Sequence, residues 1–224
     1  GTYNLLKIIL DYWIKCPKKL KENFKFINIS TDEVFGECKV SSPFNENSRI
    51  SPNSPYSASK ASADHLVNAW NKTFKLPCIT TNCGNNYGPN QNLEKLIPKT
   101  INSIINKKKI PVYGNGKNIR DWIYVTDHIE ALILIMESKF TFDRYLIGSR
   151  NTLTNLKLVE KICKMYDHLV NSQFDSFSLV EFVEDRKGHD FCYALNPNRI
   201  EDVLGWKPKI TLEDGLNETI KSYL

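Results

Sequence analysis

The sequence predicts an α/β fold with a mainly parallel sheet. Apolar runs of strand length alternate along the chain with longer segments of helical periodicity, and polar residues follow one apolar run directly, over 30–33. Strands that alternate with helices are typical of βαβ units and a parallel sheet. The chain has 224 residues, of which 41% are hydrophobic, and this is enough apolar material for a sizeable core.

The first half of the chain contains two predicted helices and two predicted strands. Apolar residues at helical spacing indicate a helix over 3–16, and a lysine-rich turn separates it from a strand expected over 24–29. A loop rich in Ser, Pro and Asn over 41–55 leads into a long helix, 56–74, and then a second strand, 77–82.

The second half of the chain continues the alternation. Thr126 and Thr211 are expected to cap the helices that follow them. In chain order we expect a loop over 85–92, a helix over 94–106, strands over 111–113 and 120–124, a helix over 126–138, a strand over 145–148, a helix over 154–166, a strand over 179–183 and a final helix after 211.

Composition and charge argue against several classes of protein. The net charge of +5 is small and the lysines are spread along the chain, so nucleic-acid binding is not expected. No apolar stretch of about 18 residues is present, so no membrane partner is expected. The six cysteines form no C-x-x-C pair and have no metal-ligand spacing with the four histidines, which favours a reduced, cytoplasmic protein without a metal site.

Tyr56 and Lys60 form the first candidate for chemistry. Residues four apart share one face of a helix, so the Tyr hydroxyl and the Lys ammonium can approach one site. A nearby cation lowers the pKa of a phenol, and a phenol tuned in this way can remove a hydroxyl proton near neutral pH. The spacing alone is weak evidence, since an exposed helix with an ordinary lysine gives the same pattern.

Asp32 and Glu33 form the second candidate. They follow an apolar strand, where open α/β sheets place their ligand crevice, although on their own two adjacent carboxylates are better explained by a solvated turn. Together with Tyr56 and Lys60 they would offer an acid, a base and an oxidation catalyst.

A glycine-rich phosphate loop is absent from the sequence. No G-x-G-x-x-G follows a strand, and Gly114-Asn115-Gly116 lacks the third glycine. Either the domain never bound a dinucleotide, or the chain is a fragment that lacks its first βαβ units.

A series of motifs favours the second explanation. In order they are STDEVFG (30–36), SPYSASKAS (54–62), NCGNNYGP (82–89), EKLIP (94–98), PVYG (111–114), RDW (120–122), DRKGHD (185–190) and GWKP (205–208). Taken together they resemble the extended short-chain dehydrogenase/reductase family and, within it, the nucleotide-sugar 4,6-dehydratases. The Thr-Asp-Glu triplet carries this narrower likeness, because related epimerases have small residues in place of Asp32 and Glu33.

The resemblance implies an NAD(P)-binding Rossmann fold of the extended type that lacks its N-terminal glycine-loop segment, with a smaller C-terminal α/β substrate domain. Residues 1–84 would be the remaining part of the NAD-binding domain. Residues 85–224 would mainly bind the nucleotide sugar, with segments that return to the first domain. It also implies a homodimer in which the helices over 3–16 and 56–74 pair across a two-fold axis.

The implied reaction converts dTDP-glucose into dTDP-4-keto-6-deoxyglucose by internal hydride transfer through NAD. Tyr56 would take the C4 hydroxyl proton, and Lys60 would hold the Tyr pKa down and contact the nicotinamide ribose. Thr31 would bind the sugar near O4, Glu33 would take the C5 proton, and Asp32 would protonate the departing C6 hydroxyl. Further implied contacts are Asn86 on the nicotinamide side, Asn85 to the substrate, Lys95, Arg120, Asn155, Arg186 and His189 to the nucleotide, and Pro111 and Tyr113 beside the base.

Alternatives remain open at this stage. A UDP-glucose 4,6-dehydratase would share every catalytic residue, because thymine and uracil differ by one methyl group, worth only about 1–3 kcal/mol in a pocket. A catalytically silent protein that binds a sugar nucleotide or a partner subunit would fit the absent phosphate loop. Outside the resemblance, Arg120 could form a surface ion pair with Asp121, Asn155 could cap a helix, and Tyr113 could be a core aromatic residue.

Overall fold

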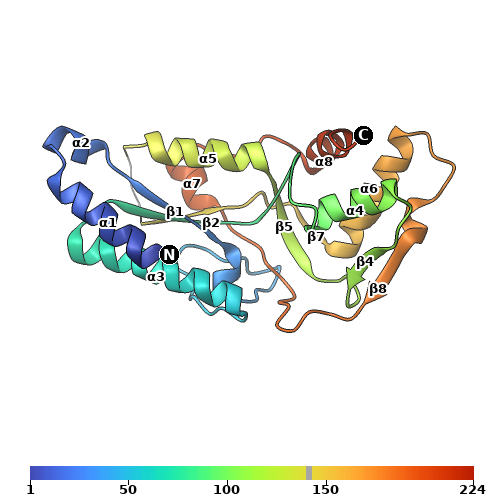
Figure 1. Ribbon diagram of the computed structural model, residues 1–224, viewed down its shortest axis with the longest axis horizontal. Coiled ribbons are helices and arrows are strands. Elements are labelled where there is room, and N and C mark those ends of the chain that lie inside the picture. The colour runs from blue at the N-terminus through green and yellow to red at the C-terminus, as the bar shows by residue number, and fades with distance from the viewer. Residues whose placement is uncertain (140–142) are drawn as a thin grey trace.

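The computed structural model describes residues 1–139 and 143–224 and confirms the α/β class (Figure 1). Its first sheet is entirely parallel, with the strand order β1-β2-β6: β1 is Phe26–Thr31, β2 is Cys78–Cys83 and β6 is Arg144–Ile147. The register pairs Thr31 with Cys83 and Cys83 with Ile147, so the carboxyl ends of these strands meet at one edge of the sheet.

Helices cover both faces of this sheet (Figure 1). α1 (Thr2–Lys15) and α3 (Pro55–Phe74) lie on one face, where Leu6 and Val67 are buried against Leu76 and Cys78. α5 (Val125–Glu137) and α7 (Asn198–Leu204) lie on the other. There Ile79, Tyr145 and Ile147 are buried in a separate cluster, because alternate strand residues point to opposite faces.

A second group of elements lies beyond the carboxyl ends of these strands (Figure 1). β3 (Asn85–Tyr87) pairs in parallel with β5 (Ile119–Tyr124), β5 pairs antiparallel with β7 (Thr152–Thr154), and β4 (Ile110–Tyr113) pairs in parallel with β8 (Val180–Val183). α4 (Leu96–Ile105), α6 (Asn155–Leu169) and α8 (Leu212–Lys221) pack with them around a core that includes Ile97, Ile162 and Leu216.

Most predicted elements are present, and several predictions need correction. The lysine-rich turn is a short helix, α2 (Lys18–Asn23), and the predicted loop over 85–92 contains β3. Elements that the pattern did not predict are β7, the 3-10 helices η1 (Asp32–Phe35) and η2 (Ser176–Leu179), and α7. β3 and β7 are too short for a readable periodicity, and their pairing with β5 defines them.

The two predicted caps have different outcomes. Thr211 caps α8, because its hydroxyl oxygen accepts a hydrogen bond from the backbone N–H of Asp214 at 3.1 Å. Thr126 is not a cap: α5 begins one residue earlier, with Tyr124 at the N-cap position and no side-chain cap bond. No helix within residues 1–139 and 143–224 is both long enough and apolar enough to span a membrane.

Asp121 on β5 joins the two groups of elements. Its buried carboxylate accepts hydrogen bonds from the backbone N–H and the hydroxyl of Ser149, the latter at 2.7 Å. Gly84 and Gly148, which follow β2 and β6, allow the close approach: a Cβ on Gly84 would lie 2.9 Å from the Asp121 carbonyl oxygen, and one on Gly148 would lie 2.6 Å from the Asp121 carboxylate.

We therefore expect Gly148→Ala to destabilise the protein by about 1–3 kcal/mol, because the added methyl group overlaps both Asp121 and Leu195. Urea unfolding measures the free energy of unfolding. Lys7→Ala, at an exposed position on α1, is the control and should change stability by only a few tenths of a kcal/mol. Equal stability of the two variants would contradict this account of the junction.

Candidate active site

The turn after β1 holds Thr31, Asp32 and Glu33. Thr31 is the N-cap of η1, where its hydroxyl oxygen accepts from the backbone N–H of Glu33 at 3.3 Å and its hydroxyl group donates to the Asp32 carboxylate at 3.1 Å. Gly36 ends the turn with a φ of +78°, and a Cβ there would lie 2.4 Å from the Ser51 carbonyl oxygen. The local sequence therefore fixes the triplet at the carboxyl edge of the sheet.

The two carboxyl groups have different surroundings. Asp32 is 2% exposed, and burial together with the charge of Glu33 raises its pKa to about 7. Burial also raises the pKa of Glu33, but the positive charges of Arg120, Arg186 and Lys95 oppose that rise. One carboxyl therefore exchanges its proton near neutral pH, beside another that faces cations.

Tyr56 and Lys60 lie on the first turns of α3, which a reciprocal pair of hydrogen bonds between Ser54 and Ser57 caps. Burial, Glu33 and other anionic groups raise the pKa of Tyr56, which is opposite to the predicted direction. Burial is the largest cause, and the Lys60 ammonium donates to the Ile29 carbonyl oxygen at 2.8 Å.

Arg120 approaches the same site from β5 and is 5% exposed. Its guanidinium donates to the carbonyl oxygens of Ile119 and Asp190 at 2.7 and 2.9 Å, and it lies 4.3 Å from the centre of the Tyr193 ring. A surface ion pair with Asp121 is therefore the wrong explanation, because neighbouring side chains of a strand point to opposite faces.

The segment 185–190 follows β8 and contains two further predicted residues. The Arg186 guanidinium lies 5.3 Å from the centre of the Tyr113 ring, and the His189 Nδ1 lies 2.6 Å from the Asp185 carboxylate. Tyr113 is 39% exposed, so it is not a core aromatic residue. Pro111 precedes it on β4, which the pairing with β8 brings beside this segment.

The remaining predicted residues lie on β3 and at helix starts. Asn85 and Asn86 are half-buried on β3, Lys95 is exposed at the N-cap of α4, and Asn155 is the first residue of α6. Thr154, not Asn155, caps α6. In the described structure, four of the predicted site residues each have a buried atom without a hydrogen-bond partner: Asp32 Oδ2, Asn86 Oδ1, Asn155 Oδ1 and His189 Nε2.

Comparison with known proteins assigns the chain to a family. The family model for GDP-mannose 4,6 dehydratase matches residues 1–219. The chain belongs to the GDP-mannose 4,6 dehydratase family. The dTDP-glucose 4,6-dehydratases of Haemophilus influenzae and Escherichia coli are 44% and 45% identical to it over 229 and 237 residues, covering 100% of this chain and 68% and 66% of the two relatives.

Solved structures of this family share the fold. The dTDP-glucose 4,6-dehydratase of Bacillus anthracis, in complex with NAD, superposes with a TM-score of 0.86 and 39% identity, covering 100% of this chain and 66% of that one. The resemblance stated from the motifs and the predicted Rossmann fold of the extended type are thereby confirmed. The chain spans about two thirds of the length of these relatives.

Three residues that position this family member's site were not predicted. The Asp190 carboxylate accepts from the Tyr193 hydroxyl and from the Asn53 side-chain amide, both at 2.6 Å. Asp190 thus joins the segment 185–190 to the residues just before α3, and the Tyr193 ring packs against the Arg120 guanidinium. Asp190 stands inside one of the motifs, but its partners are far apart in sequence and no local signal indicates them.

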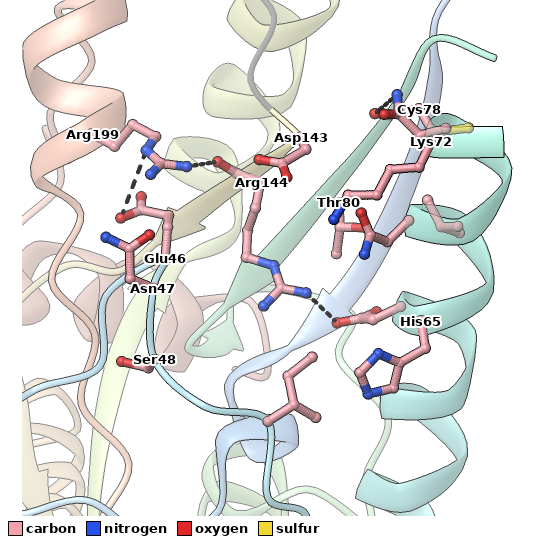
Figure 2. Close-up of a pocket in the computed structure, with 15 residues that line it drawn as sticks. Glu46, Asn47, Ser48, His65, Lys72, Cys78, Thr80, Asp143, Arg144 and Arg199 are labelled. Atoms are coloured by element: carbon pink, nitrogen blue, oxygen red, sulfur yellow. Dashed lines mark hydrogen bonds and ion pairs between the residues drawn. The ribbon is translucent and has the colours of Figure 1, made fainter. Parts of the chain in front are cut away.

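A cavity lies elsewhere, beside α3 and β6 (Figure 2). It has a volume of about 250 Å³, and ion pairs of Arg144 with Asp64 at 3.7 Å and of Arg199 with Glu46 at 3.9 Å border it. None of its lining residues belongs to the predicted site. Within residues 1–139 and 143–224, no group of three or more His, Cys, Asp or Glu side chains could hold a metal ion.

The raised pKa of Asp32 predicts a pH-dependent stability. This carboxyl has a pKa of about 7 when folded against 3.8 ordinarily, so the folded state binds its proton more tightly and stability falls as the pH rises from about 4 to about 7. Asp32→Asn removes this loss of stability. The free energy of unfolding of the variant, relative to that of the parent, should therefore rise from about pH 4 to about pH 7, by up to about 4 kcal/mol.

Thermal melts of the parent and of Asp32→Asn at pH 5 and pH 8 measure this difference. Asp11→Asn, at an exposed position on α1, is the control and should follow the parent at both pH values. A constant difference between Asp32→Asn and the parent would show that Asp32 titrates normally.

Proposed function

We propose that the protein is a nucleotide-sugar 4,6-dehydratase that converts dTDP-glucose into dTDP-4-keto-6-deoxyglucose with NAD as cofactor. The observation that carries the proposal is the pair Asp32 and Glu33, in which burial raises the pKa of one carboxyl to about 7 beside a second carboxyl that faces cations. The names of the relatives support the substrate and the reaction.

Loss of water from C6 needs an acid and a base together. Asp32, with its pKa of about 7, can donate a proton to the departing C6 hydroxyl. Glu33 is half-buried, and its raised pKa suits removal of the C5 proton once C4 is a ketone. Thr31 lies beside both carboxyl groups, where its hydroxyl can hold the sugar near O4.

The residues present fit the nicotinamide end of NAD. The buried Asn86 Oδ1 has no partner in the described structure and can accept from a carboxamide N–H, and the Lys60 ammonium lies at the carboxyl end of β1, where a ribose hydroxyl can share it. Bound NAD supplies the hydride acceptor and donor. Tyr56 takes the C4 hydroxyl proton. For this step the raised pKa of Tyr56 must fall, which a positive charge entering the site would bring about.

The nucleotide would bind among the cationic residues on the other side of Glu33. The positive charges of Arg120, Arg186 and Lys95 all oppose the rise in the pKa of Glu33, so the three side chains lie around one region. Such a group of cations suits a diphosphate. The partnerless Asn155 Oδ1 and His189 Nε2 suit hydrogen bonds with the same ligand. Asn85 would contact the sugar, and Pro111 and Tyr113 would flank the base.

The proposal extends to domains, location and assembly. Residues 1–84 would serve the cofactor and residues 85–224 mainly the nucleotide sugar, in a cytoplasmic enzyme. The homodimer is supported by three aromatic residues where α1 meets α3. The Trp70 ring centre lies 5.5 Å from that of Tyr3 and 5.6 Å from that of Phe74, and we call these three residues the aromatic row. Tyr3 and Phe74 are 53% and 43% exposed, and a two-fold axis would let the rows meet.

Asp32→Asn tests the reaction in the native protein. We expect it to lower kcat for dehydration of dTDP-glucose by about 10²–10⁴-fold, because an amide cannot donate the proton that C6 requires. Oxidation at C4 should survive, so NADH absorbance should accumulate. Glu22→Gln, at an exposed position on α2, is the matched control and should keep the parental rate. Parental turnover by Asp32→Asn would refute the acid role.

Phe74→Glu tests the assembly. A carboxylate in the aromatic row would be buried without a partner in the dimer, so the mass measured by light scattering should shift from dimer toward monomer. Val40→Glu replaces a side chain that is 50% exposed and belongs to neither helix, and should leave the mass unchanged. An unaltered dimer of Phe74→Glu would place the interface elsewhere, and a monomeric parent would remove the dimer from the proposal.

A further inference from the structure

Two buried cysteines from distant parts of the chain lie in contact. The sulfur atoms of Cys38 and Cys192 are 3.2 Å apart, although 154 positions separate the residues in the sequence. Cys38 is 9% exposed and Cys192 is 1% exposed. The sulfurs need to approach by only about 1 Å more to reach the length of a disulfide bond.

The backbone on both sides of this contact is already paired. The N–H of Cys38 donates to the carbonyl oxygen of Cys192 at 3.0 Å, and the N–H of Phe191 donates to the Glu37 carboxylate at 2.6 Å. On its other side Tyr193 donates to the Ile119 carbonyl oxygen on β5 at 3.0 Å. The direct backbone hydrogen bond between the two cysteines and the contact of their sulfur atoms place them within reach of a disulfide bond.

The pair differs from the other cysteines of the chain. All six are free thiols, and among the described residues only Cys38 and Cys192 place their sulfurs in contact. Cys78, Cys83 and Cys163 are buried singly, and Cys16 is half-buried at the end of α1. Oxidation in the folded state therefore has one favoured product.

We propose that Cys38 and Cys192 are a modification site, at which a low-molecular-weight disulfide such as oxidised glutathione converts the two thiols into a reversible disulfide bond. One thiolate attacks the small disulfide, forming a mixed disulfide and releasing one small thiol. The second cysteine then displaces the other small thiol. The two cysteines lose two electrons and two protons, and the small disulfide gains them.

Access governs the rate of this exchange. Burial and the neighbouring thiol raise the pKa of Cys38 to about 12, and burial also raises the pKa of Cys192, so few thiolates form at neutral pH. Reaction therefore needs local opening and accelerates as the pH rises.

The bond would tie together two segments of the candidate site. Cys38 follows the turn that holds Asp32 and Glu33, and Cys192 follows the segment of Arg186 and His189. Oxidation would prevent these segments from separating and would constrain the unfolded chain through a long loop. This expectation concerns the structure alone and does not depend on the proposed reaction.

Peptide mapping tests the proposal. The folded protein is incubated with oxidised glutathione, its remaining thiols are blocked with N-ethylmaleimide, and it is digested without reductant for mass spectrometry. We expect a linked peptide pair that contains Cys38 and Cys192 and disappears on reduction. The oxidised protein should also show a higher Tm than the reduced protein.

Two variants separate this bond from unspecific oxidation. Cys38→Ala should abolish both the linked peptide and the rise in Tm, whereas Cys163→Ala, at a buried cysteine with no sulfur neighbour, should keep both. Cys192→Ala repeats the first test if Cys38→Ala fails to fold. The proposal would be overturned if Cys38 and Cys192 stayed unlinked in protein whose Cys16 already carries glutathione. It would also be overturned if Cys38 formed disulfides with the other cysteines as often as with Cys192.

Discussion

The alternation of Arg120 and Asp121 along β5 is the constraint on which the site depends. Neighbouring side chains of a strand point to opposite faces, so one residue faces the candidate site while the next faces the junction with the first sheet. Asp121 fixes the turn after β6 through Ser149. Arg120 therefore reaches the turn of Asp32 and Glu33 from a strand whose position is already set.

Both side chains are charged and buried, which is costly unless hydrogen bonds replace water. The structure meets this requirement with backbone groups: carbonyl oxygens receive the Arg120 guanidinium, and backbone N–H groups donate to Asp121. Asp32 is the exception, since one of its carboxylate oxygens is buried without a partner in the described structure. The same burial that is unfavourable for a carboxylate gives this group the pKa that a proton donor needs.

Local patterns predicted the main helices and strands well, because apolar periodicity reports directly which face of an element is buried. They failed for β3 and β7, whose three residues each carry no periodicity and exist as strands only through pairing with β5. They also missed the set of Asn53, Asp190 and Tyr193, since no rule of spacing links residues that far apart. They also did not indicate that burial and Glu33 raise the pKa of Tyr56, or that the Lys60 ammonium donates to a backbone carbonyl oxygen, because both are tertiary properties.

The sequence by itself determined the α/β class, the order of the main elements, the motifs that mark the family and the residues that could act as acid and base. It could do so because these properties depend on residue types and on neighbours within a few positions. Only the tertiary structure decided that Asp32 is the buried carboxyl and Glu33 the one that faces cations, that Arg120 lies on the Tyr193 ring, and that Cys38 meets Cys192. Burial and charge depend on what surrounds a group in space, and those surroundings come from segments that the fold brings together over long distances in the chain.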